Sequence, residues 1–366
     1  MMQNKTDITK LFLFLLTVTS IFISCKKTLP EQPVEYKKSN GVFICNEGNF
    51  TYGNASLSFY EPETNTVEND IFYNTNNFPP GDVAMSMAIK DTSAYLVVNN
   101  SGKILVINTN TFKYSATISG LTSPRYILFI SDTKAYVTDL YNKNIAVINP
   151  KTFTQTGSVF IGNGSEQIVK YQNFAFTVGW SFNNKVYKIN TDNDKLTDSL
   201  TVTKQPNSIV LDKNNKLWVL SDGGFSGIPG GQEIPSITKI DAETFTIEKE
   251  YTFSSVETSP ARLTINGTKD TLYFLNSSPS GGNESEGIYR MPVNSDNLPD
   301  VAFIPQGDKL FYGLGIDPAT SDIYVSDAID YLQKGIVYHY KSDGTIINTF
   351  KTGIIPSYFC FKPSDK

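Results

Sequence analysis

The residue types that usually perform catalysis are scarce in this chain. It has a single histidine, His339 in "GIVYHYK", so a serine or cysteine nucleophile would have only one candidate base. His339 falls within an alternating, strand-like run, which favours a structural role. One histidine with Cys45 and Cys360, at opposite ends of the repeat region, does not supply a His/Cys metal site. We therefore expect no enzyme activity, no metal and no cofactor.

Two other stretches have the composition of a ligand-binding loop but not its context. "NTDND" (190–194) carries oxygen ligands of the kind that calcium prefers, yet no nearby glutamate could bind bidentately, so a solvated turn is expected. "GNG" (162–164) is not followed by a helix, so it lacks the N-terminus that holds a phosphate. The formal net charge is −5 and no basic cluster is present, which argues against a nucleic-acid partner. Recognition of a ligand is the chemistry that remains.

The elements that would position recognition residues are short β-strands that repeat along the chain. "SPRYILFISDTKAYVTDLYNKNIAVINPKTFTQTGSVFIGN" (123–163) contains four strand-like runs, and the same order recurs before and after it. The first runs of the units start near residues 84, 125, 166, 207, 261, 312 and 357. A period near 40–45 with four strands per unit is typical of a β-propeller. The sequence predicts an all-β, seven-bladed propeller of four-stranded blades over 41–366, with no convincing amphipathic helix after residue 25.

The two ends of the repeat region complement each other. "GVFICNEG", "SLSFYEP" and "NTVENDIFYN" match strands two, three and four of a unit, whereas "IIPSYFCFKP" (354–363) matches a first strand. One blade is therefore closed by N- and C-terminal strands, which leaves no open sheet edge. Cys45 and Cys360 fall in neighbouring strands of that blade, and a disulfide between them is one expectation. Two buried free thiols are the alternative, because the strand register decides.

The connections differ between the two faces of the predicted propeller. Loops joining strands two and three share a face with the inter-blade connections, and they grow as long as "DGGFSGIPGGQEIP" (222–235), whereas the opposite face has tight turns such as "SDTK". The long loops and inter-blade connections also carry aromatic residues, and loops on a rigid scaffold often carry function. We predict a ligand-binding surface that includes Phe50, Tyr52, Phe78, Asp82, Arg125, Tyr141, Trp180, Phe182, Phe225, Tyr312 and Tyr331.

The N-terminal residues read as a targeting signal. Lys5 and Lys10 precede the apolar run "LFLFLLTVTSIFI" (11–23), which is too short to span a bilayer comfortably. It ends at Ser24-Cys25, which resembles the lipobox of bacterial lipoproteins. We expect residues 1–24 to be a lipoprotein signal peptide, Cys25 to be lipidated, and residues 25–40 to form a polar tether. An uncleaved signal anchor is the alternative.

The repeats resemble a known group of exported propellers. The "AYVTD…IAVIN" pattern is similar to the YVTN/YncE-like repeat of seven-bladed propellers. Residues 45–87, with "NEGN" (46–49), "ASLS" (55–58) and "GD" (81–82), look like the opening of the Bacteroidota surface lipoproteins (DUF5074-like) found beside TonB-dependent outer-membrane receptors. Some members of that group capture cobalamin and pass it to the transporter.

The resemblance implies a lipid-anchored outer-membrane protein, at the cell surface or on the periplasmic face, that contacts the membrane only through its anchor. Its partners would be a small-molecule ligand, with cobalamin as the candidate, and a TonB-dependent receptor. Two alternatives remain open at this stage. One is a propeller hydrolase or lactonase, and the other is a passive cell-envelope interaction module.

Overall fold

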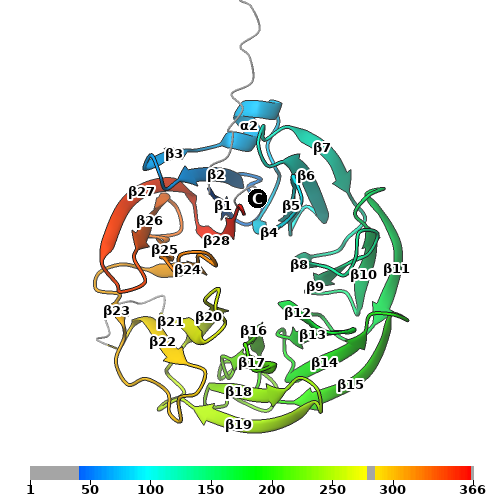
Figure 1. Ribbon diagram of the computed structural model, residues 1–366, viewed down its shortest axis with the longest axis vertical. Coiled ribbons are helices and arrows are strands. Elements are labelled where there is room, and N and C mark those ends of the chain that lie inside the picture. The colour runs from blue at the N-terminus through cyan, green and yellow to red at the C-terminus, as the bar shows by residue number, and fades with distance from the viewer. Residues whose placement is uncertain (1–40, 278–284, 364–366) are drawn as a thin grey trace, which may run out of the picture. The chain divides into compact units, whose positions relative to one another are not determined.

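The computed structural model describes residues 41–277 and 285–363, and these all fall within one compact unit, 36–366. They form seven four-stranded antiparallel sheets arranged around a centre, with the first strand of each sheet innermost (Figure 1). The predicted all-β, seven-bladed propeller is confirmed. The first-strand positions are confirmed to within about two residues, which is the usual uncertainty of a strand boundary.

The strands of the blades follow one another along the chain, apart from the closing blade. The closing blade contains β28 (Pro356–Phe361), β1 (Val42–Asn46), β2 (Ser56–Glu61) and β3 (Thr66–Glu68). The next two blades contain β4 (Ala84–Lys90), β5 (Ser93–Val98), β6 (Lys103–Asn108) and β7 (Tyr114–Ile118), then β8 (Pro124–Phe129), β9 (Ala135–Asp139), β10 (Asn144–Asn149) and β11 (Thr154–Phe160). The fourth contains β12 (Ile168–Tyr171), β13 (Phe174–Gly179), β14 (Lys185–Asn190) and β15 (Lys195–Thr201).

The remaining three blades complete the ring. They contain β16 (Pro206–Leu211), β17 (Lys216–Ser221), β18 (Ser236–Asp241) and β19 (Thr246–Thr252), then β20 (Pro260–Ile265), β21 (Thr271–Asn276), β22 (Gly287–Pro292) and β23 (Ile304–Pro305), and finally β24 (Phe311–Ile316), β25 (Ile323–Asp327), β26 (Lys334–Tyr340) and β27 (Ile346–Ile354). Among the described residues, no helix is long and apolar enough to cross a membrane.

The closing blade joins the two ends of the propeller as the sequence predicts. β28 pairs antiparallel with β1, which places Phe43 opposite Cys360 and Cys45 opposite Tyr358. The two cysteines are therefore two residues out of direct register, and both are buried free thiols. Of the two alternatives for this pair, the structure has the free thiols and not the predicted disulfide, because Cys45 faces a tyrosine. Cys25, the predicted lipidation site, lies outside the described residues.

The outer edge of the closing blade differs from the prediction. The run "NTVENDIFYN" was expected to form a strand, but only Thr66–Glu68 does so, and Ile71–Asn76 forms the short helix α2. Asp70 and Asn77 bound this helix in the left-handed conformation, which asparagine and aspartate tolerate better than most residues. This short helix was not predicted. Ile71 and Phe72 look strand-like in sequence because they are apolar, and both are fully buried against the first two blades.

Each sheet buries both of its faces against neighbouring blades. In β5, Leu96 and Val98 pack toward the closing blade, while Tyr95 and Val97 pack toward the following blade. Alternate residues of a strand point to opposite faces, so a strand that serves two cores must be apolar throughout. This explains why the second and third strands of the blades read as continuous apolar runs.

Candidate ligand-binding site

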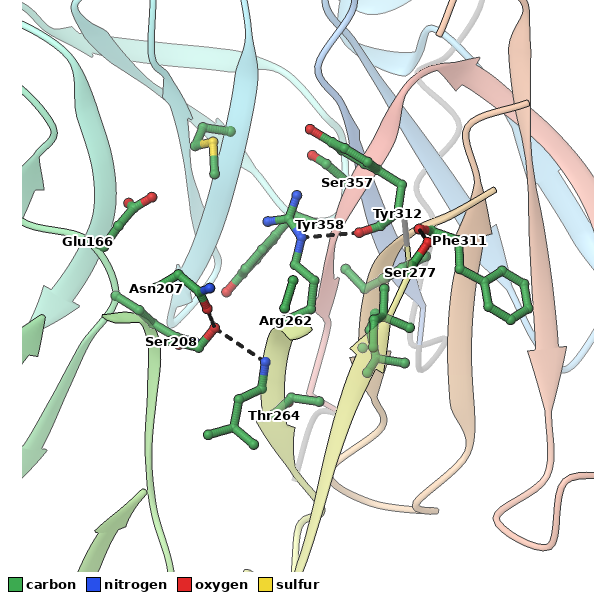
Figure 2. A pocket seen from close by; sticks show the side chains of 18 of the residues that line it. Glu166, Asn207, Ser208, Arg262, Thr264, Ser277, Phe311, Tyr312, Ser357 and Tyr358 are labelled. Carbon is green, nitrogen blue, oxygen red and sulfur yellow. Dashed lines mark hydrogen bonds between the residues drawn. The ribbon is translucent and has the colours of Figure 1, made fainter. Parts of the chain in front are cut away.

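A cavity of about 660 Å³ lies at the centre of the propeller (Figure 2). Its wall comes mainly from the inner strands, including Arg125 in β8, Arg262 in β20 and Tyr358 in β28. Residues of the loop-rich face, among them Glu47 and Trp180, also line it. The cavity therefore joins the core of the ring to the face that carries the long loops.

Irregularities in the inner strands supply part of the polar lining. The β-strand register shifts next to Arg125 in β8, Asn207 in β16, Arg262 in β20 and Tyr312 in β24. A β-bulge inserts a residue that has no cross-strand partner and changes the direction of its side chain. Repeating the bulge from blade to blade brings these side chains to one level of the central cavity.

The "YVTD" motif of the second strand supports the bulge. In β9, the Thr138 hydroxyl accepts a hydrogen bond from the Tyr126 backbone N–H at 3.0 Å, inside the β8 bulge. The Asp139 carboxylate accepts two more from the backbone N–H groups of Thr122 and Ser123, in the connection between blades. The "YVTD" motif, which is similar to the repeat of exported propellers, therefore fixes the backbone of the bulge and of the connection on the loop-rich face.

Asp222 lies directly after β17, one position beyond Ser221, which is the equivalent of Asp139. Its carboxylate accepts hydrogen bonds from the Trp180 indole N–H at 3.0 Å and from the Gly224 backbone, and Asn207 lies 3.4 Å away. Burial raises the pKa of Asp222, and these donors partly oppose that rise. Asp222 thus holds a tryptophan and an asparagine at the cavity.

Arg125 forms a closed pair with Glu166. Arg125 Nε donates to Glu166 Oε2 at 2.6 Å and Nη2 donates to Oε1, so both carboxylate oxygens are engaged. Although burial alone lowers the pKa of Arg125, the Glu166 carboxylate outweighs it and raises the pKa well above its usual range. The guanidinium also lies 6.0 Å from the Trp180 ring. This pair is a rigid, charge-compensated part of the wall.

Arg262 is held more loosely on the other side of the cavity. Its Nε donates to the Tyr312 carbonyl at 3.1 Å, and its guanidinium lies 5.0 Å from the Tyr312 ring. Its Nη2 is 3.9 Å from Glu47 Oε1, beyond hydrogen-bond distance. Glu47 Oε2 accepts the Tyr312 hydroxyl at 3.1 Å, and the Tyr331 ring packs edge-on against Tyr312.

The "NEGN", "ASLS" and "GD" elements act together on one loop. The Asn46 amide donates to the hydroxyls of Ser56 and Ser58, which joins the first element to the second. The Asp82 carboxylate accepts a hydrogen bond from the Thr51 backbone at 2.8 Å. These contacts shape residues 47–55 and leave Glu47 facing the cavity. Asp82 was predicted as a binding residue; it caps this loop and does not line the cavity.

The other predicted site residues separate into three groups. Arg125, Trp180, Tyr312 and Tyr331 line the cavity. Five aromatic residues are more than half exposed on the loops of the same face, namely Phe50, Tyr52, Tyr141, Phe182 and Phe225. Phe78 belongs to neither group, because its ring packs edge-on against Phe72 of α2 and Tyr114 of β7.

Several lining residues were missed by the sequence prediction. They are Glu47, Tyr126, Glu166, Asn207, Asp222, Arg262 and Tyr358. Their common signal is position, since most of them sit at the start of a first strand, where the bulge occurs. A bulge is not visible in the alternation of polar and apolar residues, and that alternation was the basis of the prediction.

His339 and the "NTDND" turn, which the sequence predicts to be structural, both contact other parts of the fold. His339 is buried in β26, where its Nε2 lies 2.9 Å from Asp322 and its ring stacks on Tyr324. In the "NTDND" turn, Asp194 accepts hydrogen bonds from Lys134 and Tyr136. Within 41–277 and 285–363, no group of three or more His, Cys, Asp or Glu side chains could hold a metal ion.

Comparison with known proteins agrees with this fold. The profile of a family described as a domain of unknown function, DUF5074, matches residues 40–361. A quinonprotein alcohol dehydrogenase-like protein from Bacteroides thetaiotaomicron VPI-5482 is a similar solved structure, with 17% identity and a TM-score of 0.65 over 88% of this chain and 78% of that chain.

Two further solved structures are similar. A protein of Bacteroides fragilis NCTC 9343, provisionally named a 6-phosphogluconolactonase, is 11% identical with a TM-score of 0.64 over 89% of this chain and 98% of that chain. A functionally unknown protein of Desulfotomaculum acetoxidans DSM 771 is 14% identical with a TM-score of 0.63 over 89% of this chain and 100% of that chain. At these identities the likeness concerns the fold alone. No curated protein matches the sequence significantly.

Proposed function

The chain belongs to the DUF5074 family, and we propose that it is a cell-envelope lipoprotein that captures a ligand on its loop-rich face without transforming it. The observation that carries the proposal is the set of exposed aromatic residues on the long loops, around a cavity that opens among those same loops. Aromatic rings have large apolar surfaces whose exposure to water is unfavourable. Their grouping on one face therefore favours a role in ligand recognition.

The lead ligand is a corrinoid such as cobalamin, delivered to a TonB-dependent outer-membrane receptor. A corrin is broad, flat and partly apolar, so it would cover the loops that bear Tyr141, Phe182 and Phe225 and would extend beyond a cavity of about 660 Å³. Stacking on these rings and hydrogen bonds to the loop backbones would supply the affinity. The corrinoid and the receptor come from the family resemblance, and the exposed aromatic surface supports them.

Calorimetric titration with cyanocobalamin and with cobinamide tests the proposal. We expect saturable binding of at least one of them, and Tyr141→Ala should weaken it by about 1–4 kcal/mol if Tyr141 is a dominant contact. Phe160→Ala is the matched control, because Phe160 is similarly exposed but lies on the outer strand β11. This control should bind like the wild type.

Two results would redirect the proposal. Absence of heat with both corrinoids at high protein concentration would remove corrinoids as the ligand. Turnover of a lactone that a chelator abolishes would favour the hydrolase alternative over capture.

The membrane anchor has its own test. Cys25→Ala should release the protein from the membrane fraction or leave the signal peptide uncleaved, because the acylated thiol would be lost. Normal processing with unchanged membrane fractionation would rule out the lipoprotein interpretation.

A further inference from the structure

The hydrogen-bonding groups in the central cavity are unequally engaged. Both oxygens of Glu166 are taken by Arg125, and those of Asp222 accept hydrogen bonds from Trp180 and Gly224. One oxygen of Glu47 accepts the Tyr312 hydroxyl. The acceptors on the wall are therefore mostly satisfied by the protein itself.

Several donors on the wall are free, although those of Arg125 and Trp180 are engaged. Arg262 uses only its Nε for a hydrogen bond, so its Nη1 and Nη2 have no partner at hydrogen-bond distance among the described residues. The hydroxyls of Tyr126, Tyr331 and Tyr358 also lack a hydrogen-bond partner within 41–277 and 285–363, and all three residues line the cavity. Figure 2 shows Arg262 reaching into the middle of this space. The hydrogen-bonding groups of the cavity that have no partner are therefore mainly donors.

The backbone at Arg262 gives a second, independent observation. Arg262 has φ 60°, a left-handed conformation that residues with a side chain adopt rarely, and it lies inside the β20 bulge. Three other residues with positive φ, Val83, Gln205 and Ile355, fall just before an inner strand and not within it. Strain of this kind tends to collect at ligand sites, where it fixes the direction of a side chain.

We propose that Arg262 is an oxyanion-binding residue, which receives a carboxylate or phosphate group of the ligand at the centre of the cavity. The guanidinium offers two parallel N–H donors that match the paired oxygens of either group. The hydroxyls of Tyr126 and Tyr358 line the same space and add neutral donors. This deepens the proposed function, because it gives the chemistry of the ligand group that enters below the aromatic loops.

The surrounding charges define what kind of anion site this is. Two of the three arginines of the chain line the cavity, together with the carboxylates of Glu47, Glu166 and Asp222. The formal charge of these five groups is −1, so selectivity for an anion comes from which groups are unengaged and not from net charge. Arg125 is already paired with both oxygens of Glu166, whereas Arg262 has no bidentate partner. A single oxyanion group is therefore expected to bind at Arg262.

The test uses small anions in place of the ligand. Wild-type protein is titrated calorimetrically with sodium phosphate, with sodium succinate and with neutral succinamide, at constant ionic strength maintained by chloride. We expect saturable binding of phosphate or succinate at one site, and none of succinamide. The stronger of the two anions identifies the group as a phosphate or a carboxylate.

Variants locate the site. Arg262→Gln should weaken binding of the preferred anion by about ten- to hundredfold, the value of hydrogen bonds to a charged group. Arg290→Gln removes the same charge from β22, outside the cavity, and should bind like the wild type. If Arg262→Gln does not fold, Arg262→Lys carries the test; it keeps the charge but loses the fork, so binding should still weaken.

The proposal is overturned if the wild type binds neither anion saturably, if succinamide binds as well as succinate, or if the Arg262 variants retain wild-type affinity. Equal weakening by Arg290→Gln would also overturn it, because net charge would then explain the binding. No corrinoid enters these titrations, so a negative cobalamin result and a negative anion result are separate outcomes.

Discussion

Asp139 ends β9, whereas Asp222 lies one position further along its blade, directly after β17, and the two carboxylates have different partners. Asp139 accepts hydrogen bonds from backbone N–H groups and fixes the connection between blades. Asp222 instead accepts the Trp180 indole, and the pKa of Asp222 is raised by burial. Two carboxylates at neighbouring positions of the repeat therefore have different roles, and Asp222 is the one that holds a side chain of the cavity wall.

His339 gives the stability of the protein a predictable dependence on pH. Burial lowers the pKa of His339 in the folded protein, although Asp322 partly opposes this. In the unfolded chain the histidine pKa is about 6.5. As the pH falls below that value, the histidine is protonated in the unfolded state but remains neutral in the folded state. The free energy of unfolding therefore decreases.

The expected slope is at most about 1.4 kcal/mol per pH unit, between pH about 6.5 and the lower pKa of folded His339. Urea denaturation of the wild type and of His339→Gln at several pH values would measure it. The difference isolates this group, since the chain has one histidine and the buried carboxyl groups are common to both proteins. Parallel pH profiles would contradict the prediction.

The two buried cysteines should be unreactive in the folded protein. Burial raises the pKa of Cys45, and it raises the pKa of Cys360 to about 12, so little thiolate forms at neutral pH. Thiol labelling of Cys25→Ala protein should give no rapid reaction when native and two labelled cysteines when denatured without reductant. Denatured, unreduced protein with no free thiol would instead show that Cys45 and Cys360 are bonded.

At the scale of elements, the bulges of the inner strands connect the fold to the site. The Thr138 hydroxyl accepts the Tyr126 N–H, which the bulge removes from the strand ladder. Thr138→Val should therefore lower the free energy of unfolding by about 1–3 kcal/mol, the cost of a buried unsatisfied donor. Thr154→Val in the exposed start of β11 is the control and should change stability little. Chemical denaturation measures both, and equal effects would contradict this role of Thr138.

Elements were predictable from the sequence to the extent that they are periodic. Strand starts, blade count and closure follow from apolar runs and turn residues, which are local signals. The helix α2 was missed because Ile71 and Phe72 are apolar in either conformation, and tertiary burial selects the helix. The bulges were missed because they depend on pairing with a partner strand, and Tyr126, which lies in the β8 bulge and lines the cavity, was missed with them.

On the scale of the whole molecule, seven similar blades make a ring with two unlike faces. Opposite the loop-rich face, the strands are joined by turns such as those after β4 and β24. The aromatic loop residues were predictable, because loop length and composition are written in the sequence. That Trp180, Tyr312 and Tyr331 line one cavity with Arg262 was not predictable, since it depends on residues from different blades meeting at the centre.

The measurement that tests this account most directly is amide hydrogen–deuterium exchange of the protein with and without saturating cyanocobalamin. We predict that the corrinoid slows exchange in the loops 47–55, 140–144, 180–184 and 222–235, while the turns of the opposite face keep their rates. Unchanged exchange throughout, or protection confined to the opposite face, would contradict capture of a corrinoid by the loop-rich face.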